Sequence, residues 1–229
     1  MRSTPETLEV LYEDNHLIAV NKRVGDIVQG DKTGDIPLSE IVKEYIKRKY
    51  NKPGAVFLGV VHRLDRPTSG IVVFARTSKA LSRLNELFKN RETSKTYWAI
   101  VTARPAENEA TLTHHLTRHE KTNTSRAHEK PVSDSKPASL SYKIIHQFER
   151  YTALEIDLHT GRHHQIRAQL SAIKCPIKGD LKYGAPRSNP DGGIHLHARS
   201  LSFLHPVSKH LLTLVAPTPP DTLWKQIKA

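Results

Sequence analysis

Residues 60–76, with the sequence V-V-H-R-L-D-R-P-T-S-G-I-V-V-F-A-R, indicate how this chain folds. Two apolar runs rich in β-branched residues, 56–61 and 71–75, flank a polar loop, a pattern typical of two strands joined by a functional loop. Pro67 has no backbone N–H to donate, and Gly70 tolerates a positive φ. The sequence therefore predicts that the loop between the strands is irregular but tightly constrained.

Charged side chains fill this loop. Arg63, Asp65 and Arg66 place one carboxylate between two guanidinium groups. One interpretation is a surface ion cluster at a strand end, which would contribute little to stability. The other is a functional carboxylate whose neighbours hold its charge. The loop alone leaves both interpretations open.

The composition favours a polyanionic partner. The chain of 229 residues carries 35 Lys and Arg against 23 Asp and Glu, a formal net charge of +12. Neutralising phosphates releases counterions, so nucleic acid is the leading candidate. An acidic membrane surface is the rival, but no long apolar run or strongly basic amphipathic helix is present. We predict one domain over residues 1–229 and a cytoplasmic location, since Cys175 is the only cysteine and no secretory signal opens the sequence.

Hydrophobic periodicity predicts both helices and strands. Apolar residues at helical spacing predict helices over 38–50 and over 78–91, the second capped by Ser78. In 151–159 apolar and acidic residues alternate, which indicates a half-buried strand. The remaining predicted strands cover 8–12, 16–20, 95–101, 201–204 and 211–216, and a short last helix is expected to be capped by Asp221.

Residues 105–137 are polar and rich in proline and histidine, which predicts a long loop or a hairpin within the domain. His115 and His119 are four residues apart, as metal ligands on a helix would be. No Glu completes an H-E-x-x-H motif, so we predict no metal site here. Contact with RNA by a flexible basic segment is the favoured interpretation.

Cationic side chains also follow the predicted strand 151–159. The sequence T-G-R-H-H-Q-I-R covers 160–167 and predicts a helix that begins near Arg162. Arg and His at a helix N-terminus oppose the macrodipole, so an anionic partner explains them better than helix stability does. A Ser-His-Asp hydrolase is a poor alternative, since no G-x-S-x-G motif is present.

Five motifs together resemble those of the RluA-type pseudouridine synthases. H-R-L-D-R-P-T-S-G at 62–70 resembles the family's signature loop, and T-G-R-H-H-Q-I-R resembles T-G-R-x-H-Q-I/L-R with His163 at the variable position. The resemblance runs from about Leu8 to Ala216. It implies an α/β fold with a mixed, largely antiparallel sheet, flanking helices and a central RNA-binding cleft. The other three motifs are K-x-Y at 95–97, G-D-x-x-Y-G at 179–184, and a closing motif made of L-H-A at 196–198 and H-P at 205–206.

The resemblance also implies the reaction and its residues. A member of this family isomerises uridine to pseudouridine in RNA, here ribosomal or transfer RNA, without a cofactor. The signature aspartate, Asp65, is expected to be catalytic and to pair with Arg167. Tyr97 is expected to stack on the target uracil, and Arg63 to fill the space left by the flipped base. Weaker candidates, for contact with phosphate or backbone, are Arg66, Arg162 and His164.

The chain departs from the family's pattern in several places. Arg23 replaces the proline of N-K-P-x-G, and Ala168-Gln169 replaces the more usual V-H. About seven residues precede the first predicted strand, so we expect no S4 RNA-binding module and a monomer whose catalytic domain selects its own substrate. The rival hypotheses are a non-catalytic RNA-binding protein on the same fold and a metal-dependent nuclease, which would need clustered carboxylates.

Overall fold

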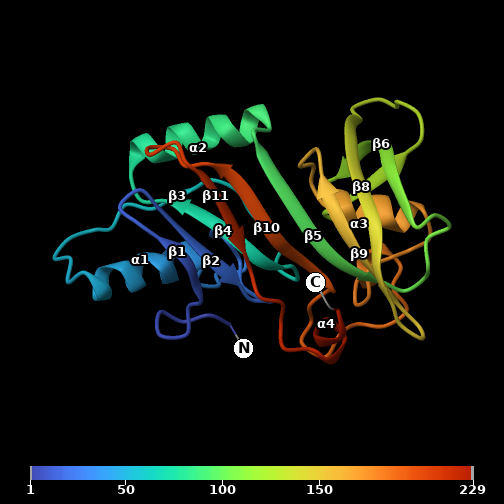
Figure 1. The fold of residues 1–229 in the computed structure, drawn as a ribbon, viewed down its shortest axis with the longest axis horizontal. Coiled ribbons are helices and arrows are strands. Elements are labelled where there is room, and N and C mark those ends of the chain that lie inside the picture. The colour runs from blue at the N-terminus through green and yellow to red at the C-terminus, as the bar shows by residue number, and fades with distance from the viewer. Residues whose placement is uncertain (1, 228–229) are drawn as a thin grey trace. The chain divides into compact units, whose positions relative to one another are not determined.

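The computed structural model describes residues 2–227, which form two compact units. Unit 1 contains the residues up to Ser94 together with Ala198–Pro219. Unit 2 contains Lys95–His197 and the residues from Pro220 onward. Mostly antiparallel strands and few helices make up each unit (Figure 1), so the predicted α/β class is confirmed. The chain passes between the units three times, within the strands β5 (Thr93–Val101) and β10 (Leu196–Leu204) and again between Pro219 and Pro220.

Unit 1 is a sheet with helices on both faces. Its other elements are β1 (Val10–Glu13), β2 (Leu17–Lys22), α1 (Leu38–Lys49), β3 (Gly59–Val60), β4 (Ser69–Ala75), α2 (Ser78–Asn90) and β11 (Leu211–Val215). The strand order is β1-β2-β4-β10, with β3 paired to β4 and β11 to β10. Strands β1 and β2, β2 and β4, and β10 and β11 pair in antiparallel orientation.

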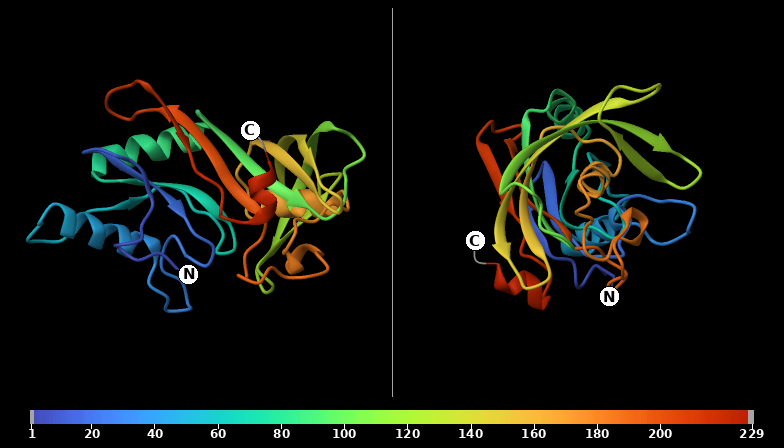
Figure 2. Two further views of the ribbon diagram at one scale, coloured as in Figure 1. Left: turned by 60° about the horizontal axis from the view of Figure 1, so that its bottom comes forward. Right: turned by 90° about the vertical axis from the view of Figure 1, so that its right-hand side faces the viewer.

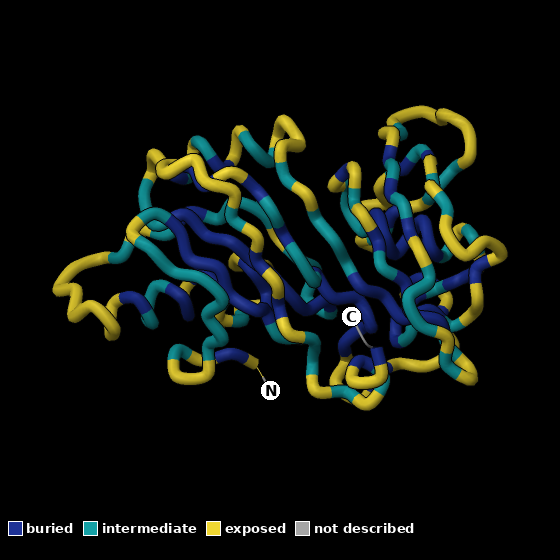
Figure 3. The backbone as a smooth tube through the Cα atoms, viewed as in Figure 1, coloured by how far each residue is buried: buried dark blue, intermediate teal, exposed yellow. Residues whose placement is uncertain are grey.

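The two central strands of unit 1 are buried on both faces (Figure 3). Successive side chains of a strand point to opposite faces, so the facing pair Ala19 and Val73 lies in one apolar cluster with α2. The next pair, Val20 and Val72, lies in a second cluster with α1. The two helices therefore cover opposite faces of the sheet (Figures 1 and 2).

Two local predictions for unit 1 need correction. The side chain of Thr77, not Ser78, caps α2, because its hydroxyl accepts from the backbone N–H of Ala80 at 3.2 Å. Of the strand predicted over 56–61, only Gly59–Val60 pairs with β4. Because β4 ends at Ala75, opposite Gly59, residues 56–58 have no residue of β4 to pair with. The helix predicted over 38–50 is confirmed as α1.

The strands of unit 2 follow the order β5-β9-β8-β6-β7, and each neighbouring pair is antiparallel. Its other elements are β6 (Glu109–His119), β7 (Thr124–His128), β8 (Lys136–Gln147), β9 (Thr152–Leu158), α3 (Gln165–Ala172), a 3-10 turn (Leu181–Tyr183) and α4 (Thr222–Gln226). On β9, Leu154 and Ile156 face an apolar cluster that also contains Ile166 and Leu170 of α3. The predicted alternation of this strand is confirmed. Asp221 caps α4 as predicted, accepting from the N–H of Leu223 at 2.7 Å.

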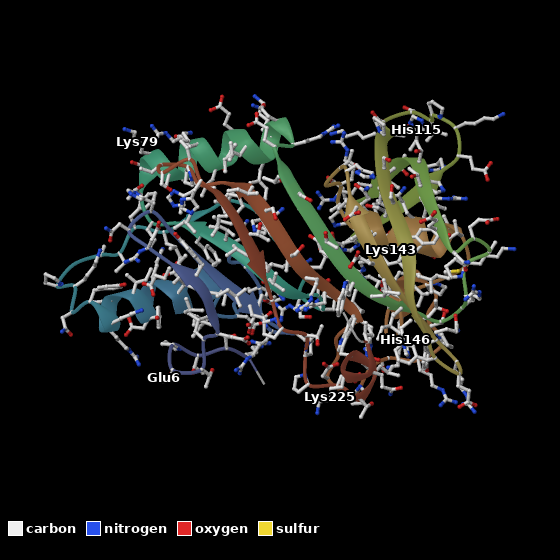
Figure 4. The ribbon with its side chains drawn as sticks, in the orientation of Figure 1. Glu6, Lys79, His115, Lys143, His146 and Lys225 are labelled. Carbon is white, nitrogen blue, oxygen red and sulfur yellow. The ribbon has the colours of Figure 1, made fainter. Side chains whose placement is uncertain are left out.

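The segment 105–137 contains the antiparallel β6–β7 hairpin. His115 and His119 lie on β6, where Figure 4 labels His115, and not on a helix. Residues four apart on a strand are about 13 Å apart, so these two rings are not placed to share an ion. Within residues 2–227, no group of three or more His, Cys, Asp or Glu side chains is arranged to hold a metal.

The helix predicted to begin near Arg162 begins three residues later. His164 has φ of 50°, a left-handed conformation, and Gln165 is the first residue of α3. Arg162, His163 and His164 therefore precede the helix, whereas Arg167 lies in its first turn, where a cation opposes the macrodipole. No helix in the described part of the chain has the length and apolar character needed to span a bilayer.

Candidate active site

In unit 1, a buried lysine holds the loop that carries Asp65. Lys22, the last residue of β2, has no exposed surface. Its ammonium donates to the carbonyl oxygens of Arg23 at 3.0 Å, Arg66 at 3.1 Å and Thr68 at 2.7 Å. Two of these oxygens belong to the loop itself, so one cation fixes the backbone just after Asp65. Sequence reasoning missed this residue, although it belongs to the N-K-R-V-G element.

Burial lowers the pKa of Lys22 from 10.5 to about 7. The charges of Asp26 and Asp65 act in the opposite direction and favour the protonated form. The carboxylates of Asp26 and Asp65 thus offset part of the cost of burying the ammonium group of Lys22. Such a perturbed group beside a carboxylate is typical of functional sites.

Replacing Lys22 by Met is expected to remove a pH-dependent part of the stability. Between the folded pKa of about 7 and the unfolded value of 10.5, only the unfolded chain binds this proton. The free energy of unfolding therefore rises with pH in that window, by at most about 1.4 kcal/mol per pH unit. Urea unfolding of both proteins from pH 7 upward measures the difference. Parallel pH profiles for wild type and Lys22→Met would contradict this account.

The loop is also constrained by a turn and by a glycine. The backbone N–H of Thr68 donates to the carbonyl of Asp65 at 3.0 Å, which closes a turn over 65–68. Gly70 has φ of +114°, and a Cβ there would lie 2.4 Å from the carbonyl oxygen of Ala198. Only glycine fits this position. The predicted irregular, constrained loop is therefore present, with Asp65 half-buried and Arg63 exposed.

Arg66 is engaged by carboxylates of an exposed loop of unit 1. Its Nη1 lies 2.6 Å from Asp35 and its Nη2 lies 3.5 Å from Asp31. Hydrogen bonds from Arg2 and then Arg66 lower the pKa of Asp35 to about 2, so Asp35 stays ionised. A phosphate that contacts Arg66 would have to compete with these carboxylates.

In unit 2, Arg167 is buried and held on three sides. Its Nε and Nη2 donate to the two oxygens of Asp180 at 2.7 and 2.8 Å, a bidentate pair. Its Nη1 lies 2.9 Å from Nε2 of His164. The centre of its guanidinium group lies 4.8 Å from the ring centroid of Tyr183. Asp180 and Tyr183, both from the G-D-x-x-Y-G element, are thus partners of Arg167 that sequence reasoning did not assign.

The remaining candidates of unit 2 occupy separate positions. Tyr97 lies on β5 opposite Ile156 and packs, half-buried, against the apolar cluster of unit 2. Arg162 donates from Nε to the carbonyl oxygen of Pro137 at 3.1 Å. Gln169, which stands where the family more usually has a histidine, is fully buried and donates to the carbonyl of Leu112 at 3.0 Å. It links α3 to β6 and carries no ionisable group.

The predicted site residues therefore form two sets. Arg63, Asp65 and Arg66 belong to unit 1, whereas Tyr97, Arg162, His164 and Arg167 belong to unit 2. Within the second set, His164 and Arg167 are in direct contact.

Comparison with known proteins identifies the family. Residues 16–172 match the model of the family described as RNA pseudouridylate synthase. The chain belongs to this family. Ribosomal large subunit pseudouridine synthase D of Xylella fastidiosa is 35% identical over 228 residues, covering 93% of this chain and 67% of that protein. The tRNA pseudouridine synthase C of Pectobacterium carotovorum is 32% identical over 230 residues, covering 91% of this chain and 58% of that protein.

The fold agrees with this assignment. The structure of human RNA Pseudouridylate Synthase Domain Containing 4 aligns with a TM-score of 0.78 over 94% of this chain and 90% of that one, at 24% identity. This RNA pseudouridine synthase is an isomerase, and the resemblance drawn from its motifs is confirmed. The alternative of a non-catalytic RNA-binding protein is not supported.

Proposed function

We propose that this pseudouridine synthase isomerises uridines of structured ribosomal or transfer RNA, with Asp65 as the catalytic residue. The observation that carries the assignment is the loop of Asp65, which is fixed at two carbonyls by a fully buried cation, Lys22. A catalytic carboxylate needs such a rigid support, because its position relative to the sugar sets the rate. The relatives named for ribosomal and transfer RNA supply the two substrate classes.

The reaction breaks the N-glycosidic bond, rotates the uracil and joins it to the ribose through C5. Asp65 acts in its ionised form, as a nucleophile towards the sugar or as a base that removes a ribose proton. Arg167 is the proposed charge partner, since a guanidinium stays protonated and presents several donors to a carboxylate. Asp180 keeps this guanidinium in one orientation. The isomerisation is redox-neutral and adds no outside group, so it needs no cofactor.

The target uracil must leave its helical stack before Asp65 can reach the sugar, at a cost of a few kcal/mol. Arg63 is proposed to occupy the vacated space, and its exposed side chain is free to reach RNA. Tyr97 is proposed to stack on the flipped base. Further contacts with the RNA backbone are assigned to Arg66, Arg162 and His164. We place the protein in the cytoplasm as a monomer, with both units forming one catalytic domain.

Tritium release tests the proposal. When the uracil is joined through C5, the hydrogen at C5 is lost to water. RNA tritiated at C5 of its uridines is prepared from cells that lack the protein and separated into ribosomal and transfer fractions. We expect purified protein to release tritium from one fraction. Absence of release from both fractions would contradict the proposed function.

Asp35→Asn is expected to tighten RNA binding. The substitution removes one negative charge and weakens the hold on Arg66, which then becomes available to a phosphate. The affinity should rise by several fold at low salt, and the gain should shrink as salt increases, because it arises from phosphate neutralisation. Filter binding over a salt series measures both. Equal affinities for wild type and Asp35→Asn at low salt would show that Arg66 does not contact the substrate.

A further inference from the structure

The tautomer of His164 follows from its two neighbours. Arg167 can only donate hydrogen bonds, so Nε2 of His164, 2.9 Å from Nη1, accepts. A neutral imidazole that accepts at Nε2 carries its hydrogen on Nδ1, which therefore donates to Oη of Tyr183 at 2.9 Å. Arg167 is thus linked through His164 to a single phenol oxygen.

The same phenol oxygen is bonded to the β6–β7 hairpin. The backbone N–H of Ser125 on β7 donates to Oη of Tyr183 at 2.7 Å, in a buried contact. The hydroxyl of Ser125 also donates to the carbonyl oxygen of His163 at 2.7 Å. Ser125 therefore attaches the hairpin at two points, to Tyr183 in the 3-10 turn and to His163, which precedes α3. One of these points leads through Tyr183 and His164 to Arg167.

The end of this hairpin presents positive charge. Arg118, Lys121 and Arg126 are exposed, and Glu120 is the only acidic residue in the sequence 118–128. A further cation, Lys182, lies with its Nζ 3.4 Å from the carbonyl oxygen of Asn123 at the turn. Such a surface attracts phosphates without reading bases.

We propose that Tyr183 is a positioning residue that couples RNA contact at the β6–β7 hairpin to the orientation of Arg167. The proposal rests on the proposed function, in which Arg167 is the charge partner of the catalytic carboxylate. RNA that holds the hairpin fixes the N–H of Ser125, which fixes Oη of Tyr183. That oxygen in turn orients Nδ1 of His164 and directs its Nε2 towards Nη1 of Arg167. Asp180 binds Nε and Nη2 of Arg167 whether or not RNA is bound, so RNA contact changes only the hydrogen bond of Nη1 with His164.

Tyr183→Phe removes the phenol oxygen alone. The ring under the guanidinium group and its packing against Leu116 and Ala168 are kept, so the fold is retained. Losing the two hydrogen bonds that the phenol oxygen accepts should slow single turnover at saturating enzyme by about tenfold. The Kd for the same RNA should stay within about twofold, since no phosphate contact is removed.

Tyr142→Phe is the matched control. Tyr142 is another buried tyrosine of unit 2, and its Oη donates to the carbonyl oxygen of Glu107 at 3.4 Å, outside the chain of contacts to Arg167. We expect its single-turnover rate and Kd to equal those of wild type. Urea unfolding of both variants reports any general loss of stability, which would affect them alike.

A cycle that combines Tyr183→Phe with a triple replacement in the hairpin separates coupling from a purely structural role. Replacing Arg118, Lys121 and Arg126 together by Ala should weaken RNA binding and also slow the saturated reaction. In the Tyr183→Phe background the slowing should disappear while the weaker binding remains, because the link is already cut. Additive slowing, or a wild-type rate for Tyr183→Phe, would overturn the proposal. A wild-type protein that modifies no RNA would instead refute the proposed function, so the two failures are distinguishable.

Discussion

Asp65→Asn is expected to abolish pseudouridine formation while leaving RNA binding and the fold intact. Asn has nearly the same shape as Asp, so the turn closed between Asp65 and Thr68 is kept. The amide can act neither as a nucleophile nor as a base at neutral pH, and single turnover should fall by at least about 1,000-fold. Tritium release at saturating enzyme measures the rate, and filter binding measures the Kd.

Asp134→Asn is the matched control, because it changes the net charge equally at an exposed position of unit 2. Its rate should equal that of wild type. A rate for Asp65→Asn within tenfold of wild type would show that the carboxylate is not catalytic, whatever the control does.

Asp180→Ala is expected to lower the free energy of unfolding by about 3–5 kcal/mol, the usual cost of leaving one buried charge without its partner. Arg167 and Asp180 are 4% and 1% exposed, so solvent cannot replace the lost carboxylate. The guanidinium group also loses its bidentate partner, and activity should fall together with stability. Urea unfolding of wild type and variant measures the difference.

Glu44→Ala provides the comparison for an exposed pair. Glu44 lies 2.6 Å from Arg48 one turn along α1, and both side chains are largely in water. Its removal should cost no more than about 0.5 kcal/mol. If Asp180→Ala cost as little as Glu44→Ala, the buried pair would not be the support of Arg167.

Much of the fold was predictable because periodicity reports burial. The apolar stripe of 38–50 predicted α1 almost to the residue, and the alternation in 151–159 predicted β9, since each element must turn one face to a core. The strand predicted over 56–61 was mostly wrong because a strand also needs a neighbouring strand to pair with. The apolar content of 56–61 does not indicate that β4 ends opposite Gly59.

The supports of the site could not be predicted in the same way. From the sequence, Lys22 would be predicted to lie at the surface. Its burial depends on hydrogen bonds to the carbonyl oxygens of Arg66 and Thr68, which are 44 and 46 residues away in the sequence. Arg167 and Asp180 are 13 residues apart in the sequence, and α3 ends between them. Nothing in the sequence around either residue indicates that its side chain is buried. His164 adopts a left-handed backbone, so residues 162–164 lie ahead of α3, and helix propensity does not reveal this.

Mapping of pseudouridines in cellular RNA tests whether Asp65 of this protein forms them. Total RNA is taken from cells that lack this protein and from the same cells supplied with wild type or Asp65→Asn. Carbodiimide modification and primer extension then locate each pseudouridine. We predict that one or a few sites in ribosomal or transfer RNA are lost without the protein, return with wild type and stay absent with Asp65→Asn. Restoration of those sites by Asp65→Asn would contradict the account.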